Sequence, residues 1–270
     1  MSQHPQVSVI TVTYNAKDFL PETFRSVWAQ TWSDIEYIVV DGASTDGTKE
    51  MIEAHQDKIA QWVSEPDRGL YDAMNKGIRM AHGELIGIVN ASDYFEPDTV
   101  ETVVRAWQSH PEAGLFHGNV NMLNEDGSLF KLKKPRTNDL SQGMCIYHPT
   151  CFVARRVYEQ LGAFDLRYRY SADYDFVLRC QVNGIPFHYM DKVLSNFRRG
   201  GVSTTAKQKG MEEARDILVK NGFSREYADG MLRIWEKKHR KDLCLQRGYH
   251  FLKKILPAAW LNALAGKIHG

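Results

Sequence analysis

The chain has 270 residues, of which 43% are hydrophobic and 25% are charged, and its net charge is +1. These values are typical of a folded globular protein and exclude a polyanion-binding surface over the whole molecule, so we expect no nucleic-acid partner. The four cysteines have neither CxxC spacing nor a neighbouring histidine pattern, which predicts free thiols in a reducing compartment rather than a zinc site or disulfides.

The first 110 residues alternate between apolar runs and amphipathic segments. The runs at 7–15, 35–45, 60–69 and 84–93 predict strands, and the segments 18–30, 46–59, 70–83 and 97–110 predict helices. This alternation predicts an α/β fold with a parallel, doubly wound sheet, in which ligands bind at the carboxyl ends of the strands. Three of the four predicted strand ends carry carboxylates.

The second half of the chain is less regular. Residues 115–132 predict two strands around an Asp-Gly turn, residues 148–165 a strand and a helix, and residues 171–184 a further helix. Residues 197–206 predict a glycine-rich basic loop, and helices with short breaks follow from residue 209.

Two strand-end carboxylates suit a nucleoside ligand. Asp41 and Asp67 can accept hydrogen bonds from the N–H groups of a base or the hydroxyls of a ribose. They can equally cap the helices that follow or form Asx turns.

Five segments, taken in order, resemble bacterial family 2 glycosyltransferases: VSVITVTYNA, EYIVVDGASTDGT, SEPDRGLYDAMNKGI, AHGELIGIVNASD and SADYDFVLR. The similarity covers about residues 6–205 and is greatest to the branch that assembles O-antigen, capsule and colanic-acid-type polysaccharides. It implies a GT-A fold in residues 1–205, with a Rossmann-like nucleotide-sugar-binding half (about 1–110), a smaller acceptor-binding half (111–205) and a basic helical C-terminal extension (206–270).

The resemblance also implies roles for single residues. The implied contacts to the nucleotide sugar are Val12, Thr13, Tyr14, Asp41, Asp67, Asp72 and Asn75. Asp72 and Lys76 also have the spacing of an ordinary helical ion pair. His148 stands where the family lines its acceptor site, although a lone histidine is more often structural.

The segment GIVNASDYFEP (87–97) occupies the position of the family's acidic metal-binding cluster. Asn90 and Ser92 stand at positions that are usually acidic, and Asp93 occupies the last one. The resemblance implies that Asp93 binds Mn²⁺ or Mg²⁺, because these ions accept one or two carboxylates when phosphates and waters complete the shell. Asn90 and Ser92 are expected among the nucleotide-sugar contacts, where they can offer neutral oxygens to a ribose or to a metal-bound water. A helix cap is the alternative role for Asp93.

Two further sites complete the implied chemistry. Arg198 and Arg199 are expected to cover the donor diphosphate, or else to form a solvated basic loop. Asp173 is the implied general base, with an N-cap as its alternative. Asp175 is expected to cap the same helix or to pair with Arg179.

The sequence therefore predicts an inverting enzyme that transfers one sugar from a UDP-linked donor to a saccharide carried on polyprenyl diphosphate. The absence of a QxxRW motif predicts single additions. A non-catalytic nucleotide-sugar-binding subunit is the alternative, motivated by the thinned acidic cluster. A sugar-nucleotide pyrophosphorylase is disfavoured because the glycine-rich loop with Arg and Lys after the first strand is missing.

The end of the chain is basic and amphipathic. From Arg233 onward it has nine Lys or Arg residues against two Asp or Glu. Such a segment can bind an anionic membrane surface or pack as a helical appendage. With no basic apolar leader in MSQHPQ and no run of about 18 apolar residues, we expect a cytoplasmic protein, peripheral on the inner face of the membrane.

Overall fold

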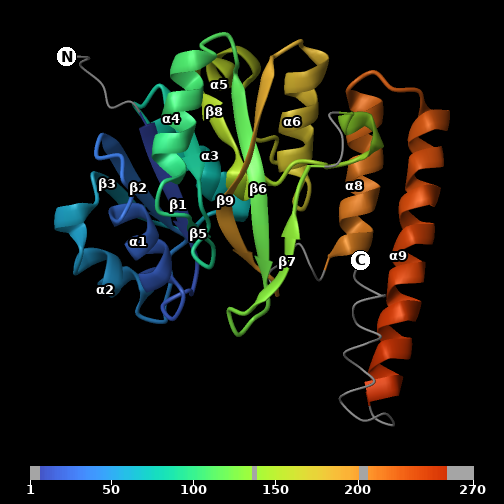
Figure 1. Ribbon diagram of the computed structural model, residues 1–270, viewed down its shortest axis with the longest axis horizontal. Helices are drawn as coiled ribbons and strands as arrows, with labels where there is room; N and C mark the ends of the chain where they lie inside the picture. Colours follow the sequence, from blue (N-terminus) through green and yellow to red (C-terminus); the bar gives the residue numbers. More distant parts are fainter. Residues whose placement is uncertain (1–6, 136–138, 201–205, 254–270) are drawn as a thin grey trace. The chain divides into compact units, whose positions relative to one another are not determined.

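The structure, a computed structural model, describes residues 7–135, 139–200 and 206–253, with side chains described as far as residue 241. The contacts divide the chain into two compact units, Met1–Gly210 and Met211–Gly270. The first holds the whole sheet and the second is helical (Figure 1). Among the described residues, no helix is both long and apolar enough to cross a bilayer.

The first unit is built on one mixed sheet with the strand order β3-β2-β1-β4-β8-β6-β9-β5, and β7 pairs with β6 at its side (Figure 1). β1, β2, β3 and β4 are parallel, as the alternating sequence predicts. The strands are β1 (Val7–Thr13), β2 (Ile35–Asp41), β3 (Gln61–Ser64), β4 (Leu85–Ile88), β5 (Tyr94–Phe95), β6 (Leu115–Leu123), β7 (Leu129–Lys133), β8 (Phe152–Ala154) and β9 (Phe187–Arg198).

Helices cover both faces of this sheet. They are α1 (Leu20–Trp28), α2 (Thr48–Glu53), α3 (Leu70–Met80), α4 (Thr99–Ser109), α5 (Arg155–Leu161) and α6 (Ala172–Val182), with short 3-10 turns η1 (Gln56–Lys58), η2 (Leu140–Gln142) and η3 (His148–Thr150). α3, α5 and α6 pack on the face that carries Ile10 and Leu115, and α1 packs through Phe24 on the opposite face. β1, β2 and β4 are consequently buried on both sides, which is why they read as continuous apolar runs.

The helix α3 lies very close to β1. A Cβ added at Gly77 would stand 2.4 Å from the Ile10 side chain, so glycine permits the approach. Since α3 begins directly after the loop that leaves β3, this packing fixes the first turn of α3 at the carboxyl end of the sheet.

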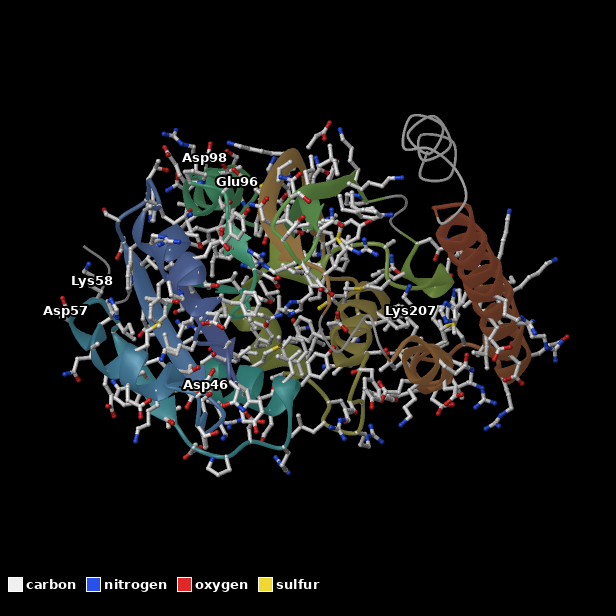
Figure 2. The ribbon with its side chains drawn as sticks, turned by 90° about the horizontal axis from the view of Figure 1, so that it is seen from below. Asp46, Asp57, Lys58, Glu96, Asp98 and Lys207 are labelled. Carbon is white, nitrogen blue, oxygen red and sulfur yellow. The ribbon has the colours of Figure 1, made fainter. Side chains whose placement is uncertain are left out.

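The strand β9 was not predicted from the sequence. It runs parallel to β6, and its last residue, Arg198, pairs with Leu123. The region before α4 anchors it, because Asn196 donates to Glu96 at 2.8 Å and Lys192 pairs with Asp98. Figure 2 shows Glu96 and Asp98 together where α4 begins. Arg198 thus belongs to a paired strand end, whereas the sequence predicted a loop, and residues 201–205 of that loop lie outside the described residues.

The second unit contains most of α8 (Lys207–Lys220) and α9 (Arg225–Lys253). Arg215 of α8 pairs with Asp229 of α9 at 2.7 Å, and Phe223 stacks on Tyr227 at the turn between them. The two helices therefore form an αα-hairpin held by polar and aromatic contacts.

Candidate active site

The loops that follow β1 and β2 are tied to each other at the carboxyl edge of the sheet. The backbone N–H of Asn15 donates to Ser44, and the Asn15 side chain accepts from the N–H of Thr45 at 2.9 Å. Asp46, labelled in Figure 2, accepts from the N–H of Lys17. A rim built from two interlocked loops holds its shape without a ligand.

Asp41, the last residue of β2, holds the loop that follows this strand. Its side chain is fully buried, and its two oxygens accept from the N–H and hydroxyl of Ser44 and from the hydroxyl of Ser64 at 2.6 Å. Both carboxylate oxygens are thus engaged with the protein. The geometry gives Asp41 the role of organising the loop after β2, and a direct contact with the nucleoside stays a prediction.

Asp67 has a different environment. Its Oδ1 accepts from the N–H of Gly69 at 2.7 Å, and no described residue donates to Oδ2. A Cβ added at Gly42 would lie 2.5 Å from that Oδ2 and 3.3 Å from the ring of Tyr14, which is 65% exposed. Glycine at position 42 therefore leaves a cradle lined by an exposed aromatic ring and by a carboxylate oxygen that receives no hydrogen bond from the part of the chain that the structure describes.

Val12 and Thr13 lie in β1 just inside this cradle. The Val12 side chain is buried in the core, and its C=O accepts from the N–H of Ala91. The Thr13 hydroxyl is buried without a hydrogen-bond partner among the described residues, so it can still bond a ligand or a water.

The helix α3 supplies Asp72 and Asn75, and both have protein partners. Asp72 accepts from the backbone and the guanidinium of Arg68, whose hydrogen bonds hold the pKa of Asp72 below its ordinary value. Asn75 is 7% exposed, accepts from the N–H of Phe164 and donates to its C=O, at 2.9 and 2.8 Å. Asn75 thus clamps the loop after α5, and the nucleotide contact that the resemblance implies stays a prediction.

Asp93 lies at the end of the loop after β4 and is almost fully buried. Its Oδ1 accepts from the backbone N–H of Arg198 at 3.0 Å, whereas Oδ2 has no described partner. Burial raises the pKa of Asp93 to about 7 against the opposing effect of that N–H. The Asn90 and Ser92 side chains also oppose the rise, although neither makes a well-aligned hydrogen bond to Oδ2.

Two orphaned oxygens therefore occur together in this loop, because the Asn90 Oδ1 is also buried without a partner among the described residues. Oxygen atoms without donors are the ligands that Mg²⁺ and Mn²⁺ prefer. The residues present fit a divalent cation in this respect. No group of three or more His, Cys, Asp or Glu side chains with metal-binding geometry occurs in the part of the chain that the structure describes.

The two arginines of the predicted diphosphate loop are held by protein groups. Arg198 pairs with Glu22 at 2.7 Å, donates to the Glu125 C=O and lies over the ring of Phe19. Arg199 lies over the ring of Phe130, 4.0 Å from its centroid. Arg198, the last residue of β9, covers the buried Asp93 carboxylate and donates its backbone N–H to it.

Asp173 lies in the first turn of α6 and is only partly buried. Its Oδ1 accepts from the Tyr71 hydroxyl at 2.8 Å and from the Tyr174 N–H at 2.9 Å. No described residue donates to its Oδ2. Tyr71 is in the first turn of α3, which begins at the carboxyl edge of the sheet. The Asp173 carboxylate therefore lies at the same edge as the cradle formed by Gly42, Asp67 and Tyr14.

Asp175, two residues further along α6, is fully buried and pairs with Arg179 at 2.9 Å. Arg179 in turn donates to the carbonyls of Leu161 and Ala163. The predicted pairing of Asp175 with Arg179 is confirmed, and it fixes the loop after α5 to α6.

His148 begins η3, and its ring packs at a tilt against Phe164, with 5.8 Å between the ring centroids. Burial lowers its pKa, and the nearby charge of Asp173 acts in the opposite direction. His148 also lines a small apolar cavity with Cys151, Tyr158 and Phe176. The structure therefore places it close to Asp173, and its contact with an acceptor sugar stays a prediction.

Sequence reasoning did not identify Tyr71, Glu22 or Asn75 in the roles that their contacts indicate. Tyr71 directly precedes Asp72 in a recognised motif, which was the available signal. Glu22 is 176 residues away from Arg198, and nothing in the sequence relates the two.

Comparison with known proteins identifies the family. Residues 8–162 match the family described as Glycosyl transferase family 2. The chain is also 31% identical over 214 residues to the PGL/p-HBAD biosynthesis glycosyltransferase of Mycobacterium tuberculosis, an alignment that covers 76% of this chain and 82% of that protein.

Solved structures show the same fold. S. aureus TarS 1–349 in complex with UDP-GlcNAc superposes with a TM-score of 0.66 at 17% identity and covers 87% of this chain and 72% of that one. The chain spans 43% of the longer TarS chain. Mannosyltransferase PcManGT from Pyrobaculum calidifontis, in complex with GDP-Man and Mn²⁺, superposes with a TM-score of 0.63 at 22% identity, covering 99% of this chain and 81% of that one. The resemblance and the α/β fold class expected from the sequence are confirmed, and this chain belongs to glycosyltransferase family 2 with a GT-A fold.

Proposed function

We propose that this protein is an inverting glycosyltransferase that moves a single sugar from a UDP-linked donor to a saccharide acceptor. The proposal rests mainly on the carboxylate of Asp173, whose Oδ2 has no donor among the described residues, at the edge of the sheet that also carries the donor cradle of Gly42, Asp67 and Tyr14. A base and a nucleotide site at one edge are what a direct transfer between two bound substrates requires.

The cradle supports a uracil base. Asp67 Oδ2 is positioned to accept one N–H, and the exposed ring of Tyr14 offers a stacking face. Uracil presents one ring N–H, whereas guanine presents two donors side by side and would need both oxygens, one of which already bonds Gly69. Among the similar structures, TarS carries UDP-GlcNAc and PcManGT carries GDP-Man.

The loop after β4 is the proposed metal site. Asp93 and Asn90 would hold Mn²⁺ or Mg²⁺ through their orphaned oxygens, and Ser92 can bond a water of the shell. When bound, the cation neutralises charge on the leaving diphosphate. Since Asp93 is enclosed by Arg198, the end of β9 has to open before a cation reaches Oδ2.

The proposed transfer is one displacement. The acceptor hydroxyl oxygen attacks the anomeric carbon, the bond from that carbon to the diphosphate oxygen breaks, and the hydroxyl proton passes to Asp173 Oδ2. Attack from the side opposite the leaving group inverts the anomeric centre. Arg198 and Arg199 lie at the β9 end, and we infer that they meet the diphosphate once this end has opened.

The acceptor is proposed to be carried on polyprenyl diphosphate at the inner face of the cytoplasmic membrane. The basic residues of α9, among them Lys237, Lys238, Arg240 and Lys241, support an anionic membrane surface as a partner, since each basic residue near such a surface contributes about 1 kcal/mol. The full chain should sediment with anionic vesicles at low salt and be released at high salt. Equal sedimentation with neutral vesicles would contradict this surface.

The central test is Asp173→Asn, with UDP release from UDP-hexoses and UDP-GlcNAc measured in the presence of prenyl-diphosphate-linked saccharides. We expect a fall of about 10²- to 10⁴-fold in turnover with donor affinity retained. Asp57→Asn is the control because Asp57 is exposed on η1, which directly precedes β3 and so lies at the amino end of the parallel strands, opposite the rim; Figure 2 labels it. Unchanged turnover in Asp173→Asn would refute Asp173 as the base, and donor binding without turnover in the wild type would indicate a nucleotide-sugar-binding protein.

The base and the cation are tested by thermal shift. UDP should raise the melting temperature more than GDP does, and Mn²⁺ should enlarge the UDP shift, because a ligand that binds only the folded state stabilises it by mass action. An equal response to both nucleotides would exclude the reading of Asp67 as selective for uracil.

A further inference from the structure

The contact between Tyr71 and Asp173 joins two helices from different halves of the fold. The two residues are 102 positions apart, on α3 and α6, and the hydroxyl oxygen of Tyr71 lies 2.8 Å from Asp173 Oδ1. The same hydroxyl lies 3.3 Å from the carbonyl of Tyr170. A tyrosine has one hydroxyl proton, and the shorter distance together with the charge of the carboxylate assigns this proton to Asp173.

This contact determines which carboxylate oxygen faces a substrate. Oδ1 receives two donors, from the Tyr71 hydroxyl and the Tyr174 N–H, and Oδ2 receives none from the described residues. Two donors on one oxygen hold the plane of the carboxylate and leave the lone pairs of the other oxygen available. We propose that Tyr71 is a positioning residue that orients Asp173 so that Oδ2 accepts the proton of the acceptor hydroxyl, an inference that rests on the proposed function.

The Tyr71 ring is itself held in place. It is 8% exposed and packs against Phe164 with 5.4 Å between the ring centroids. Phe164 is fixed by the two hydrogen bonds that its backbone makes with Asn75, one helical turn after Tyr71. The hydroxyl therefore has a rigid support, which a positioning group needs if small displacements are to affect the rate.

The described contacts of the donor cradle, formed by Gly42, Asp67 and Tyr14, do not include the Tyr71 phenol. The loop before α3 is held by Asp72, which accepts from Arg68, and by Asp67, which accepts from Gly69. Removing the Tyr71 hydroxyl should consequently leave donor binding intact and slow only the transfer step. This difference separates a positioning role from general damage to the site.

The test is a double-mutant cycle of Tyr71→Phe and Asp173→Asn, with UDP release from UDP-GlcNAc measured against prenyl-diphosphate-linked saccharides and donor affinity measured by calorimetry. Tyr71→Phe keeps the ring against Phe164 and should lower kcat about 10- to 100-fold, with the donor affinity changed less than about twofold. In the Asp173→Asn background the same change should have no further effect on the residual rate.

Tyr37→Phe is the matched control. It removes a buried hydroxyl that donates to the Thr11 side chain at 2.9 Å between β2 and β1, on the face of the sheet that α1 covers, and it makes no described contact with Asp173. It should keep kcat within about twofold, measured at a temperature where every variant is folded.

Two outcomes separate the inference from the proposed function. If Asp173→Asn keeps full turnover, the proposed function is wrong. If Asp173→Asn is inactive, but Tyr71→Phe keeps full kcat or slows both backgrounds by the same factor, Tyr71 does not act through Asp173 and only the inference is overturned.

Discussion

Asn75 offers the sharpest distinction between a nucleotide contact and a structural clamp. Its side-chain amide makes two hydrogen bonds to the backbone of Phe164, and both residues are buried. Asn75→Ala would leave one N–H and one C=O without partners, and each unsatisfied buried group costs about 1–3 kcal/mol. We therefore expect the free energy of unfolding to fall by about 3 kcal/mol, with the affinity for UDP changed less than about threefold.

Urea unfolding followed by circular dichroism measures the first quantity, and titration calorimetry with UDP measures the second. The control is Asn183→Ala, because the exposed Asn183 makes one hydrogen bond to the Arg179 carbonyl and its loss should cost less than about 1 kcal/mol. An Asn75→Ala protein that unfolds like the wild type, yet binds UDP more than tenfold less tightly, would refute the clamp and favour the nucleotide contact.

Two further variants test the donor cradle and the core. Gly42→Ala places a Cβ 2.5 Å from Asp67 Oδ2, so the carboxylate must move and UDP should bind about tenfold more weakly by calorimetry; unchanged affinity would remove Asp67 from the cradle. Burial lowers the pKa of His117 from its ordinary value of 6.5 to about 4. Between these two pH values the imidazole is protonated in the unfolded chain and neutral in the folded chain. Stability is consequently lost as the pH falls below 6.5, and His117 should account for about 2 kcal/mol of the loss between pH 7 and pH 5. Between pH 7 and pH 5, the free energy of unfolding of His117→Phe, measured in urea, should fall by about 2 kcal/mol less than that of the wild type. A pH dependence identical to that of the wild type would contradict the assignment.

The regular part of the fold follows from local patterns. The β-α alternation of the first 110 residues is predictable because β1, β2 and β4 are buried on both faces and α1, α3 and α4 each carry one apolar stripe. The hairpin of β6 and β7 and the helices α5 and α6 were also predicted, since an Asp-Gly turn and terminal glycine or asparagine residues mark their ends.

The strand β9 shows where such patterns fail. Its sequence, FHYMDKVLSNFR, has charged residues in its middle and a burial pattern that departs from strict alternation. Its position depends on pairing with β6, more than 70 residues earlier, with two irregularities in the register. Because Arg198 reaches Asp93 only through this pairing, the enclosure of Asp93 could not be derived from the loop motif alone.

The protein contacts that organise the site are not readable from the sequence. Asp67 is a candidate because it follows a predicted strand, whereas the roles of Asp93 and Asp173 are what the family resemblance implies. Asn75 was assigned to the nucleotide because its motif lies near the donor loop, whereas its partner Phe164 is 89 residues away. A single sequence reports which polar groups stand at an edge but not which of them already have protein partners.

The helix α3 contacts two different parts of the fold through one short motif. Residues four positions apart lie on the same side of a helix, and α3 has two such pairs, which face different neighbours. The first pair, Tyr71 and Asn75, contacts Asp173 of α6 and the backbone of Phe164.

The second pair, Asp72 and Lys76, holds the loop before the helix, through Arg68 and through Glu65 at 2.9 Å. Gly77 gives the helix its close approach to β1. The segment LYDAMNKG therefore contacts three neighbours, which are α6 with the loop at Phe164, the loop before α3, and β1. The position of α3 relative to the sheet sets the distance between the loop before α3 and the carboxylate of Asp173. A side chain at position 77 should therefore displace the loop and the carboxylate together.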